Sequence, residues 1–308
     1  MKSKKVVVTA AITGAVHVPS QSPYLPITPD QIVEQAVGAW KAGAAVVHIH
    51  ARVPETGEPS SDLELMRKIV TAIKAQCDVV ICITTGASQM MTVDERLLPI
   101  PDMKPELASC NAGSVNFVLA GITKYLTPDS HEWERRYLEG TRNNVFTNTY
   151  LGMERYISTM QENGTRPEFE VYDVGMINNI AYFKSTGLLQ EPIYIQFVMG
   201  IQGGLPASVD NLAFLRSTAE RQLGSFNWSV AGAGRSQLPM AAASLAMGGN
   251  VRVGLEDNLY LAPGKLAKSS AEQVEAVVRL AAILGKEIAS PDEAREILGL
   301  KGKDKVHF

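Results

Sequence analysis

Two histidines separated by a single residue lie in a run that otherwise has the character of a buried strand. His48 and His50 alternate with Val47 and Ile49, and because side chains alternate between the two faces of a strand, both imidazoles share one face. Pro54 follows closely, which places the pair near the carboxyl end of the strand. Two imidazoles on one face could bind a metal ion or could be hydrogen-bonded core residues. The pairing favours the metal.

Charged side chains recur with the same two-residue period at two later places. Arg252 and Glu256 share one parity, with Asp257 directly after them, and Glu168 and Glu170 share the parity of another apolar run. A buried carboxylate is unfavourable unless it is paired or binds a metal. Glu256 could therefore complete a site of two histidines and one carboxylate. The alternative is an ion pair of Arg252 with Glu256 or Glu170 that only ties the structure together.

Strand-like and helix-like segments alternate along the 308 residues. Strands are predicted at 6–12, 46–50, 79–84, 107–111 with a possible continuation to 117, 168–172, 193–198, 226–230 and 250–254. Helices are predicted at 29–42, 61–76, 150–163, 175–186, 209–223, 235–247 and 270–284. Such alternation indicates parallel strands joined by right-handed crossovers, and eight strands favour a closed (β/α)8 TIM barrel of the α/β class. Catalytic groups of such barrels gather at the carboxyl ends of the strands.

No change in composition marks a second domain, so we expect a single barrel domain over residues 1–308. The polar stretch 123–148 is too long for a plain connection and is interpreted as an insertion after the fourth strand. It could be a solvated excursion without a role in the site, a lid or a subunit contact. A C-terminal helix and tail are expected at about 291–308.

Composition excludes several classes of function. A net charge of −3, from 29 basic and 32 acidic residues, argues against nucleic acid as a partner, and no apolar stretch approaches the ~18 residues needed to span a membrane. Cys77, Cys82 and Cys110 are widely spaced, so neither a disulfide framework nor a thiolate zinc site is indicated. We expect a cytoplasmic protein. Gly-rich loops at 199–204 and 232–235 could approach a phosphate or a thioester, or could be ordinary turns.

Several short motifs, taken together and in order, resemble the β-keto acid cleavage enzymes over about residues 6–298. They lie at 9–15, 48–50, 85–86, 104–106, 111–113, 167–172, 196–198, 230–232 and 254–258. The resemblance implies a zinc-dependent (β/α)8 barrel that converts a β-keto acid and acetyl-CoA into acetoacetate and a new acyl-CoA. It also implies a homo-oligomer, with a tetramer expected.

The resemblance assigns roles to individual residues. Zinc falls to His48, His50 and Glu256, and Asp257 becomes the general base with Arg252 as its partner. The other positions that it assigns to catalysis or substrate binding are Thr84, Thr85, Gly86, Ser109 and Glu170. Thr84 stands where the family has serine, which keeps a donor and an acceptor but adds a methyl group.

One departure from the family concerns the substrate's tail. Members that act on aminated β-keto acids have a glutamate after the Ile-Thr-Gly-Ala turn, whereas this chain has Val16 followed by His17. An ammonium group facing an aliphatic side chain loses hydration without compensation. The tail pocket is therefore predicted to prefer a neutral substrate. His17 could contact a hydroxyl or carboxylate tail, or could be a structural or CoA-side residue.

Other functions remain open from the residues alone. A hydrolase or lyase of the amidohydrolase-like barrel type needs further inward histidines, but the remaining ones, His17, His131 and His307, lie on no middle strand. Two histidines and a carboxylate could also hold iron for oxygen chemistry. A non-catalytic barrel that binds an acyl-CoA or an organic acid is a further alternative.

Overall fold

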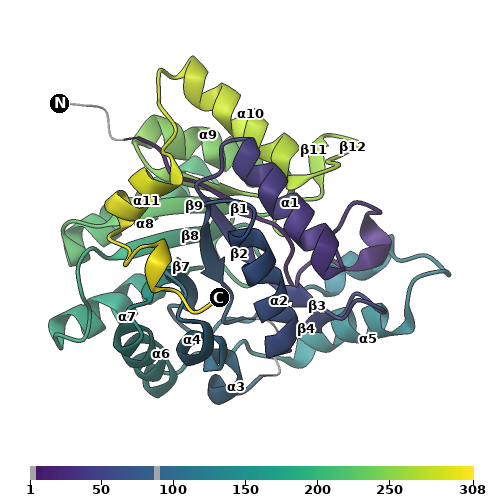
Figure 1. Ribbon diagram of the computed structural model, residues 1–308, viewed down its shortest axis with the longest axis horizontal. Helices are drawn as coiled ribbons and strands as arrows, with labels where there is room; N and C mark the ends of the chain where they lie inside the picture. Colours follow the sequence, from purple (N-terminus) through teal and green to yellow (C-terminus); the bar gives the residue numbers. More distant parts are fainter. Residues whose placement is uncertain (1–4, 87–90) are drawn as a thin grey trace.

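Eight parallel strands close into a barrel in the computed structural model, which describes residues 5–86 and 91–308. Their order around the barrel is β1-β10-β9-β8-β7-β6-β5-β2 (Figure 1). The strands are β1 (Val8–Ala11), β2 (Val46–Ile49), β5 (Val80–Ile83), β6 (Leu107–Asn111), β7 (Arg166–Val171), β8 (Tyr194–Met199), β9 (Asn227–Gly232) and β10 (Asn250–Val253). The prediction of a (β/α)8 barrel is confirmed, and each of the eight predicted strands corresponds to one strand of the barrel.

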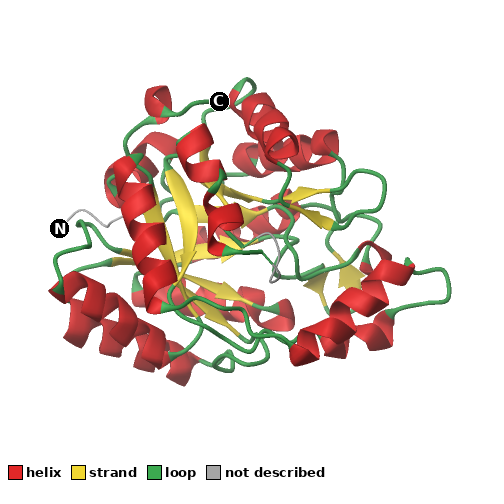
Figure 2. Cartoon of the chain, turned by 90° about the horizontal axis from the view of Figure 1, so that it is seen from below, coloured by secondary structure: helices red, strands yellow, loops and turns green. Residues whose placement is uncertain are grey.

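Helices surround the barrel in the views of Figures 1 and 2. They are α1 (Pro29–Lys41), α2 (Leu63–Lys74), α3 (Val93–Leu97), α4 (Pro99–Met103), α5 (Glu132–Gly140), α6 (Tyr150–Glu162), α7 (Val174–Ser185), α8 (Val209–Leu223), α9 (Gln237–Met247), α10 (Ser270–Ile283) and α11 (Pro291–Leu298). Local sequence explains their starts: Thr28 caps α1 within a capping box and Pro29 occupies its first turn. Helices α3, α4 and α5 were not predicted from the sequence: α3 and α4 have only five residues each, and α5 lies in the polar stretch interpreted as an insertion. Among the described residues no helix is long and apolar enough to cross a membrane.

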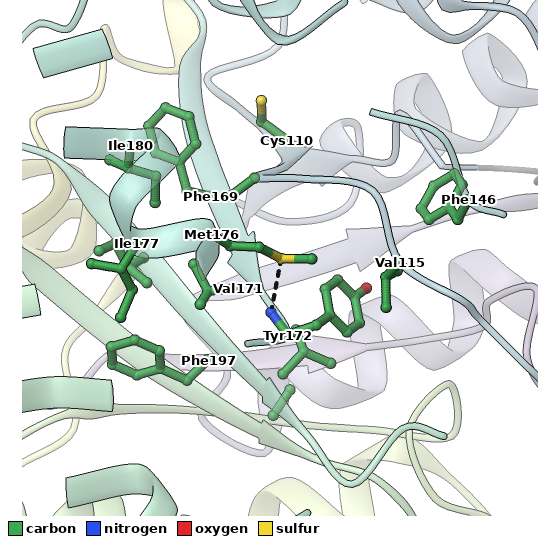
Figure 3. Packing of buried hydrophobic residues seen from close by; sticks show 14 of the residues in the cluster. Cys110, Val115, Phe146, Phe169, Val171, Tyr172, Met176, Ile177, Ile180 and Phe197 are labelled. Carbon is green, nitrogen blue, oxygen red and sulfur yellow. Dashed lines mark hydrogen bonds between the residues drawn. The ribbon is translucent and has the colours of Figure 1, made fainter. Parts of the chain in front are cut away.

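The strands separate an apolar outside from a polar inside. Val47 and Ile49 pack outward into a hydrophobic cluster shared with α1, α2 and α10, while His48 points inward. A second cluster fills the space between β7, β8 and α7, where Phe169, Val171 and residues of α7 interdigitate (Figure 3). Apolar burial of this kind supplies most of the stabilisation of the barrel.

The predicted continuation of the fourth strand to residue 117 is wrong. Strand β6 ends at Asn111, and Val115 forms only an isolated antiparallel bridge with Phe146. Ala112 and Gly113 follow the strand, and at Gly113 an added Cβ would lie 2.9 Å from the side-chain nitrogen of Asn179, so the close approach of α7 depends on glycine there.

The stretch 123–148 reaches the carboxyl ends of the barrel strands, where its Tyr137 and Phe146 line a cavity. It contains α5, which packs beside the hairpin of β3 (Ala51–Arg52) and β4 (Pro59–Ser60). The indole of Trp133 donates to the carbonyl of Thr56 at 3.2 Å, and the hydroxyl of Tyr137 donates to the carbonyl of Ala15 at 2.7 Å. Helix α5 is thereby tied to the loops that follow β1 and β3. A second hairpin, β11 (Tyr260–Ala262) and β12 (Lys265–Leu266), follows the last barrel strand.

Candidate active site

Three side chains converge at the carboxyl end of the barrel. His48 is the third residue of β2, His50 directly follows that strand, and Glu256 follows β10. The Nε2 atoms of the two histidines lie 3.1 Å apart, and Glu256 approaches His48 at 3.7 Å and His50 at 3.6 Å. All three side chains are buried. The structure therefore brings together the three residues that the sequence groups, but Glu256 lies in the turn after β10 and not on the strand itself.

Glycines make room for the Glu256 carboxylate. At Gly14, an added Cβ would lie 2.2 Å from Cγ of Glu256. Gly254 adopts a φ of +150°, and an added Cβ there would meet the carbonyl oxygen of Ala11 at 2.0 Å. Only glycine permits such close approach and such a backbone conformation. The turn between β10 and Glu256 thus depends on glycine, and so does the position of the carboxylate.

The donor atoms of this trio suit a divalent metal. Oε2 of Glu256 is buried and has no hydrogen-bond partner within the described part of the chain. Burial lowers the pKa of His48 well below its usual range, so its imidazole is neutral and has a lone pair. Burial opposes ionisation of Glu256, but Arg252 and the two histidines hold its pKa below the ordinary value. Two imidazoles and one carboxylate form a ligand set typical of catalytic zinc.

Arg252 connects the acidic groups of the site. Its Nε and Nη2 each lie 2.9 Å from one oxygen of Asp257. The same guanidinium lies 2.7 Å from Glu256, 3.1 Å from Oε1 of Gln196 and 3.4 Å from Glu170. Burial raises the pKa of Asp257, and Arg252 opposes that rise. Asp257 is therefore an ionisable carboxyl held in one orientation, as a general base must be.

The Glu170 carboxylate is held by the side chains of Asn111 and Tyr172. The amide of Asn111 donates to its Oε2 at 2.6 Å, and the hydroxyl of Tyr172 donates to the same oxygen at 3.5 Å. Burial raises the pKa of Glu170, and Arg252 lowers it. Asn111 ends β6, Tyr172 directly follows β7 and Gln196 is the third residue of β8. All three lie within the motifs of the family resemblance, but no role was assigned to them from the sequence.

Four residues after β5 and on β6 divide into two groups. Thr84 and Gly86 line the inner cavity, and Oγ1 of Thr84 accepts from the amide of Gly86 at 2.9 Å. Ser109 and Thr85 instead satisfy one another, with Thr85 N donating to Ser109 Oγ at 3.1 Å and Thr85 Oγ1 donating to the Ser109 carbonyl at 2.8 Å. Neither of them is among the described residues that line the inner cavity. Their geometry fits a brace between β5 and β6.

Two connected spaces open above the convergent trio. A small inner cavity of about 70 Å³ is bounded by the trio, Arg252, Asp257 and a largely apolar wall. That wall contains Ala15, Val16, Phe117, Leu119, Tyr137, Phe146, Val198 and Ile201. A wider mouth of about 740 Å³ follows, lined by Gly-rich loops after β8 and β9. Tyr137 and Phe146 reach the inner cavity from the 123–148 stretch, which therefore contributes to the site.

Val16 and His17 lie at the boundary between the inner cavity and the mouth. Val16 lines both spaces, whereas His17 lines only the mouth. The ring of His17 lies 3.4 Å from Oε1 of Gln21, and its carbonyl accepts from Arg52 at 2.8 Å. The buried Arg52 also donates to Thr13 and to the carbonyls of Gly14 and Gly57. The loop after β1 is thus held in place by one guanidinium.

Comparison with known proteins identifies the family of the chain. The family model described as beta-keto acid cleavage enzyme matches residues 5–300. The chain is 46% identical over 306 residues to 3,5-dioxohexanoate:acetyl-CoA acetone transferase of Paraburkholderia graminis, which covers 99% of each protein. It is 40% identical over 299 residues to 3-keto-5-aminohexanoate cleavage enzyme of Fusobacterium nucleatum, which covers 97% of this chain and 99% of that one.

A solved structure supports the fold. The binary complex of ObcA with oxaloacetate superposes with a TM-score of 0.73 at 20% identity, covering 92% of this chain and 68% of that one. The family resemblance inferred from the sequence motifs is confirmed by the family match and by the two relatives. The chain belongs to the beta-keto acid cleavage enzyme family.

Proposed function

We propose that this protein is a zinc-dependent acyltransferase that cleaves a β-keto acid with a neutral tail. The β-keto acid and acetyl-CoA would yield acetoacetate and a new acyl-CoA. One observation carries the proposal: the bidentate pair of Arg252 and Asp257 lies beside His48, His50 and Glu256. The possible ligand atoms of these three buried residues lie within 4.8 Å of one another. Relatives that cover nearly the whole chain carry names of acetyl-CoA-dependent reactions, which supports the same reaction class here.

His48, His50 and Glu256 would hold the zinc. When bound there, the ion supplies a Lewis acid that stabilises negative charge on the substrate's oxygens. Asp257, oriented by Arg252, would accept the proton from C2 of the β-keto acid. The carbanion attacks the acetyl thioester and releases the CoA thiolate. That thiolate attacks the original keto carbon, the C2–C3 bond breaks, and Asp257 returns its proton to C2. Every atom of both substrates is then found in the two products.

Glu170 and Thr84 would act around this proton transfer. Glu170 shares Arg252 with Asp257, so its charge limits how strongly the guanidinium withdraws charge from the base. The hydroxyl of Thr84 lines the inner cavity and accepts from Gly86, which leaves its own proton available to a substrate oxygen. The side chains of Asn111 and Tyr172 keep Glu170 in place.

The wide mouth would accept acetyl-CoA. Its walls carry Gly200, Gly203 and Gly204, which add no side chain to the space. Small residues let an extended pantetheine arm pass close to the backbone. Arg235, an exposed cation at the start of the segment that leads into α9, stands at the same rim. A thioester placed along this route would meet the acid in the inner cavity.

Within the described part of the chain, every carboxylate that lines the inner cavity already pairs with Arg252. These carboxylates are Glu170, Glu256 and Asp257, and each is hydrogen-bonded to Arg252. The remaining wall is mainly aliphatic and aromatic. An ammonium bound there would lose its hydration shell without a partner, at a cost of a few kcal/mol. A neutral tail has no such cost. The name of one relative, 3,5-dioxohexanoate:acetyl-CoA acetone transferase, supports a substrate with a neutral tail.

We further propose a single-domain, cytoplasmic homotetramer. The three cysteines are all free, which suits a reducing compartment. Tyr150, Leu151 and Tyr182 expose apolar surface on neighbouring helices α6 and α7, where a second subunit could cover them. Size-exclusion chromatography with light scattering tests the tetramer: a mass of about one chain would contradict it.

A substrate panel tests the proposed reaction. Zinc-loaded protein is incubated with acetyl-CoA and β-keto acids with neutral, anionic or cationic tails, and acyl-CoA products are separated by chromatography. We expect a new acyl-CoA and an equal amount of acetoacetate from neutral acids. Product formation without acetyl-CoA would favour the hydrolase or lyase alternative, and no product from any acid would favour a binding protein. Metal analysis after purification separates zinc from iron.

A further inference from the structure

The imidazole of His48 has a second side that the proposed reaction does not use. Its Nε2 faces His50 and Glu256, while its Nδ1 lies 3.5 Å from Sγ of Cys82. Cys82 is the register partner of His48 on the adjacent strand β5, so both side chains project inward at the same level. The contact is fixed by the barrel and not by a flexible loop.

The thiol of Cys82 continues the contact to a buried acid. Sγ donates to Oε1 of Glu168 at 3.8 Å, within the range for sulfur. Glu168, on β7, is fully buried, and so is Cys82. Burial raises the pKa of Glu168 to about 8. Oε1 can accept a hydrogen bond in either protonation state, so the contact persists through this titration.

Metal-binding histidines usually donate their other ring N–H to a carboxylate or a carbonyl, which fixes the tautomer and the ring orientation. Here a thiol stands between the imidazole and the carboxylate. We propose that Cys82 and Glu168 are positioning residues for His48: Nδ1–H donates to Cys82 Sγ, Cys82 S–H donates to Glu168, and Nε2 is thereby held toward the metal. Cys82 acts as an acceptor and a donor at once, which alanine cannot do.

Binding of a second metal ion is the alternative role for the same three side chains, and experiment distinguishes the two roles. Nδ1 of His48, Sγ of Cys82 and a carboxylate oxygen of Glu168 lie within 4.8 Å of one another and could hold a second metal ion. In that case Nδ1 would bind metal and could not donate to sulfur. The two arrangements predict different metal stoichiometry.

Zinc affinity tests the inference. The zinc dissociation constant is measured by chelator competition for the wild type, Cys82→Ala, Cys82→Ser, Glu168→Leu and Glu168→Gln. We expect Cys82→Ala and Glu168→Leu to weaken zinc binding about 10- to 100-fold. Cys82→Ser and Glu168→Gln keep a donor and an acceptor and should recover part of the loss. If Glu168→Leu does not fold, Glu168→Gln and the two Cys82 variants still decide.

Cys110→Ala is the matched control. Cys110 is a buried cysteine on the next strand, but it belongs to the hydrophobic cluster of Figure 3. Cobalt-substituted proteins add a spectroscopic readout: the visible absorption bands should change in Cys82→Ala and remain unchanged in Cys110→Ala. Loss of packing alone would affect both variants without altering the metal's spectrum.

The positioning role of Cys82 and Glu168 rests on the metal site of the proposed function. Different experimental results would overturn the metal site and the positioning role. Wild-type protein that binds no zinc would overturn both. Zinc binding at wild-type affinity and an unchanged cobalt spectrum in Cys82→Ala would overturn only the positioning role. Two zinc ions per wild-type chain, one of them lost in Cys82→Ala, would overturn it in favour of the second metal site.

Discussion

Arg252 meets both carboxylate oxygens of Asp257, each at 2.9 Å, from two adjacent nitrogens of one guanidinium. Such bidentate pairs fix geometry as well as charge. Because Arg252 also contacts Glu256 and Glu170, a single cation links the proposed base to a proposed metal ligand. Chemistry and metal binding at this site therefore depend on the same side chain.

Replacing the proposed base tests its role without changing its shape. Asp257→Asn should lower kcat by about 10² to 10⁴, the usual contribution of a general base. The variant keeps His48, His50 and Glu256, so its zinc content should equal that of the wild type, which serves as the control. A variant that turned over at the wild-type rate would make Glu170 the better candidate.

Removing a metal ligand should have a different signature. The purified protein should carry about one zinc per chain, held by three side chains with an open position. Glu256→Ala or a combined His48→Ala, His50→Ala change should abolish stoichiometric zinc by elemental analysis. Glu55→Ala, at an exposed position, is the control. Full zinc occupancy in the double histidine variant would disprove the assignment.

Much of this site could be predicted from strand periodicity. The alternation around His48 and around Arg252 predicts that the trio and Arg252 face inward, whereas the role of Asp257 as the base comes only from the family resemblance. The same reasoning could not find Tyr137 or Phe146, because neither lies on a strand and each is placed by contacts distant in sequence: Tyr137 with Ala15, and Phe146 with Val115. Nor could it show that Ser109 is hydrogen-bonded to Thr85, since that depends on side-chain direction where the strand ends.

The residue at position 16 should determine which charge the enzyme accepts on the substrate's tail, because Val16 lines the inner cavity. Val16→Glu is expected to raise kcat/KM for an aminated β-keto acid relative to a neutral one by about a hundredfold, because a buried ammonium gains a partner. Val16→Gln has nearly the same shape without the charge and should leave the ratio within a few-fold of the wild type. Wild-type protein that preferred the aminated acid at saturating acetyl-CoA would show that this position does not select the tail.

Acid should destabilise the protein through His17. Burial lowers the pKa of His17 to about 4, whereas an unfolded histidine titrates near ~6.5. Between these values the unfolded chain binds a proton that the folded chain does not, so the free energy of unfolding decreases as pH falls from about 6.5 to 4. The contribution should be on the order of 1–3 kcal/mol.

His17→Gln should remove that part of the pH dependence, measured by urea denaturation at pH 7 and pH 4.5. His131→Gln, at an exposed position before α5, is the matched control and should leave the pH dependence unchanged. Equal loss of stability on acidification in His17→Gln and the wild type would refute this assignment.

Isotope transfer tests the central claim most directly. The zinc-loaded protein is given acetyl-CoA with ¹³C in both acetyl carbons and an unlabelled neutral β-keto acid, and the products are identified by mass spectrometry. The proposed reaction places both labelled carbons in C3 and C4 of acetoacetate and leaves the new acyl-CoA unlabelled. Label that stays in acetyl-CoA or appears as free acetate, while the β-keto acid is consumed, would contradict the account.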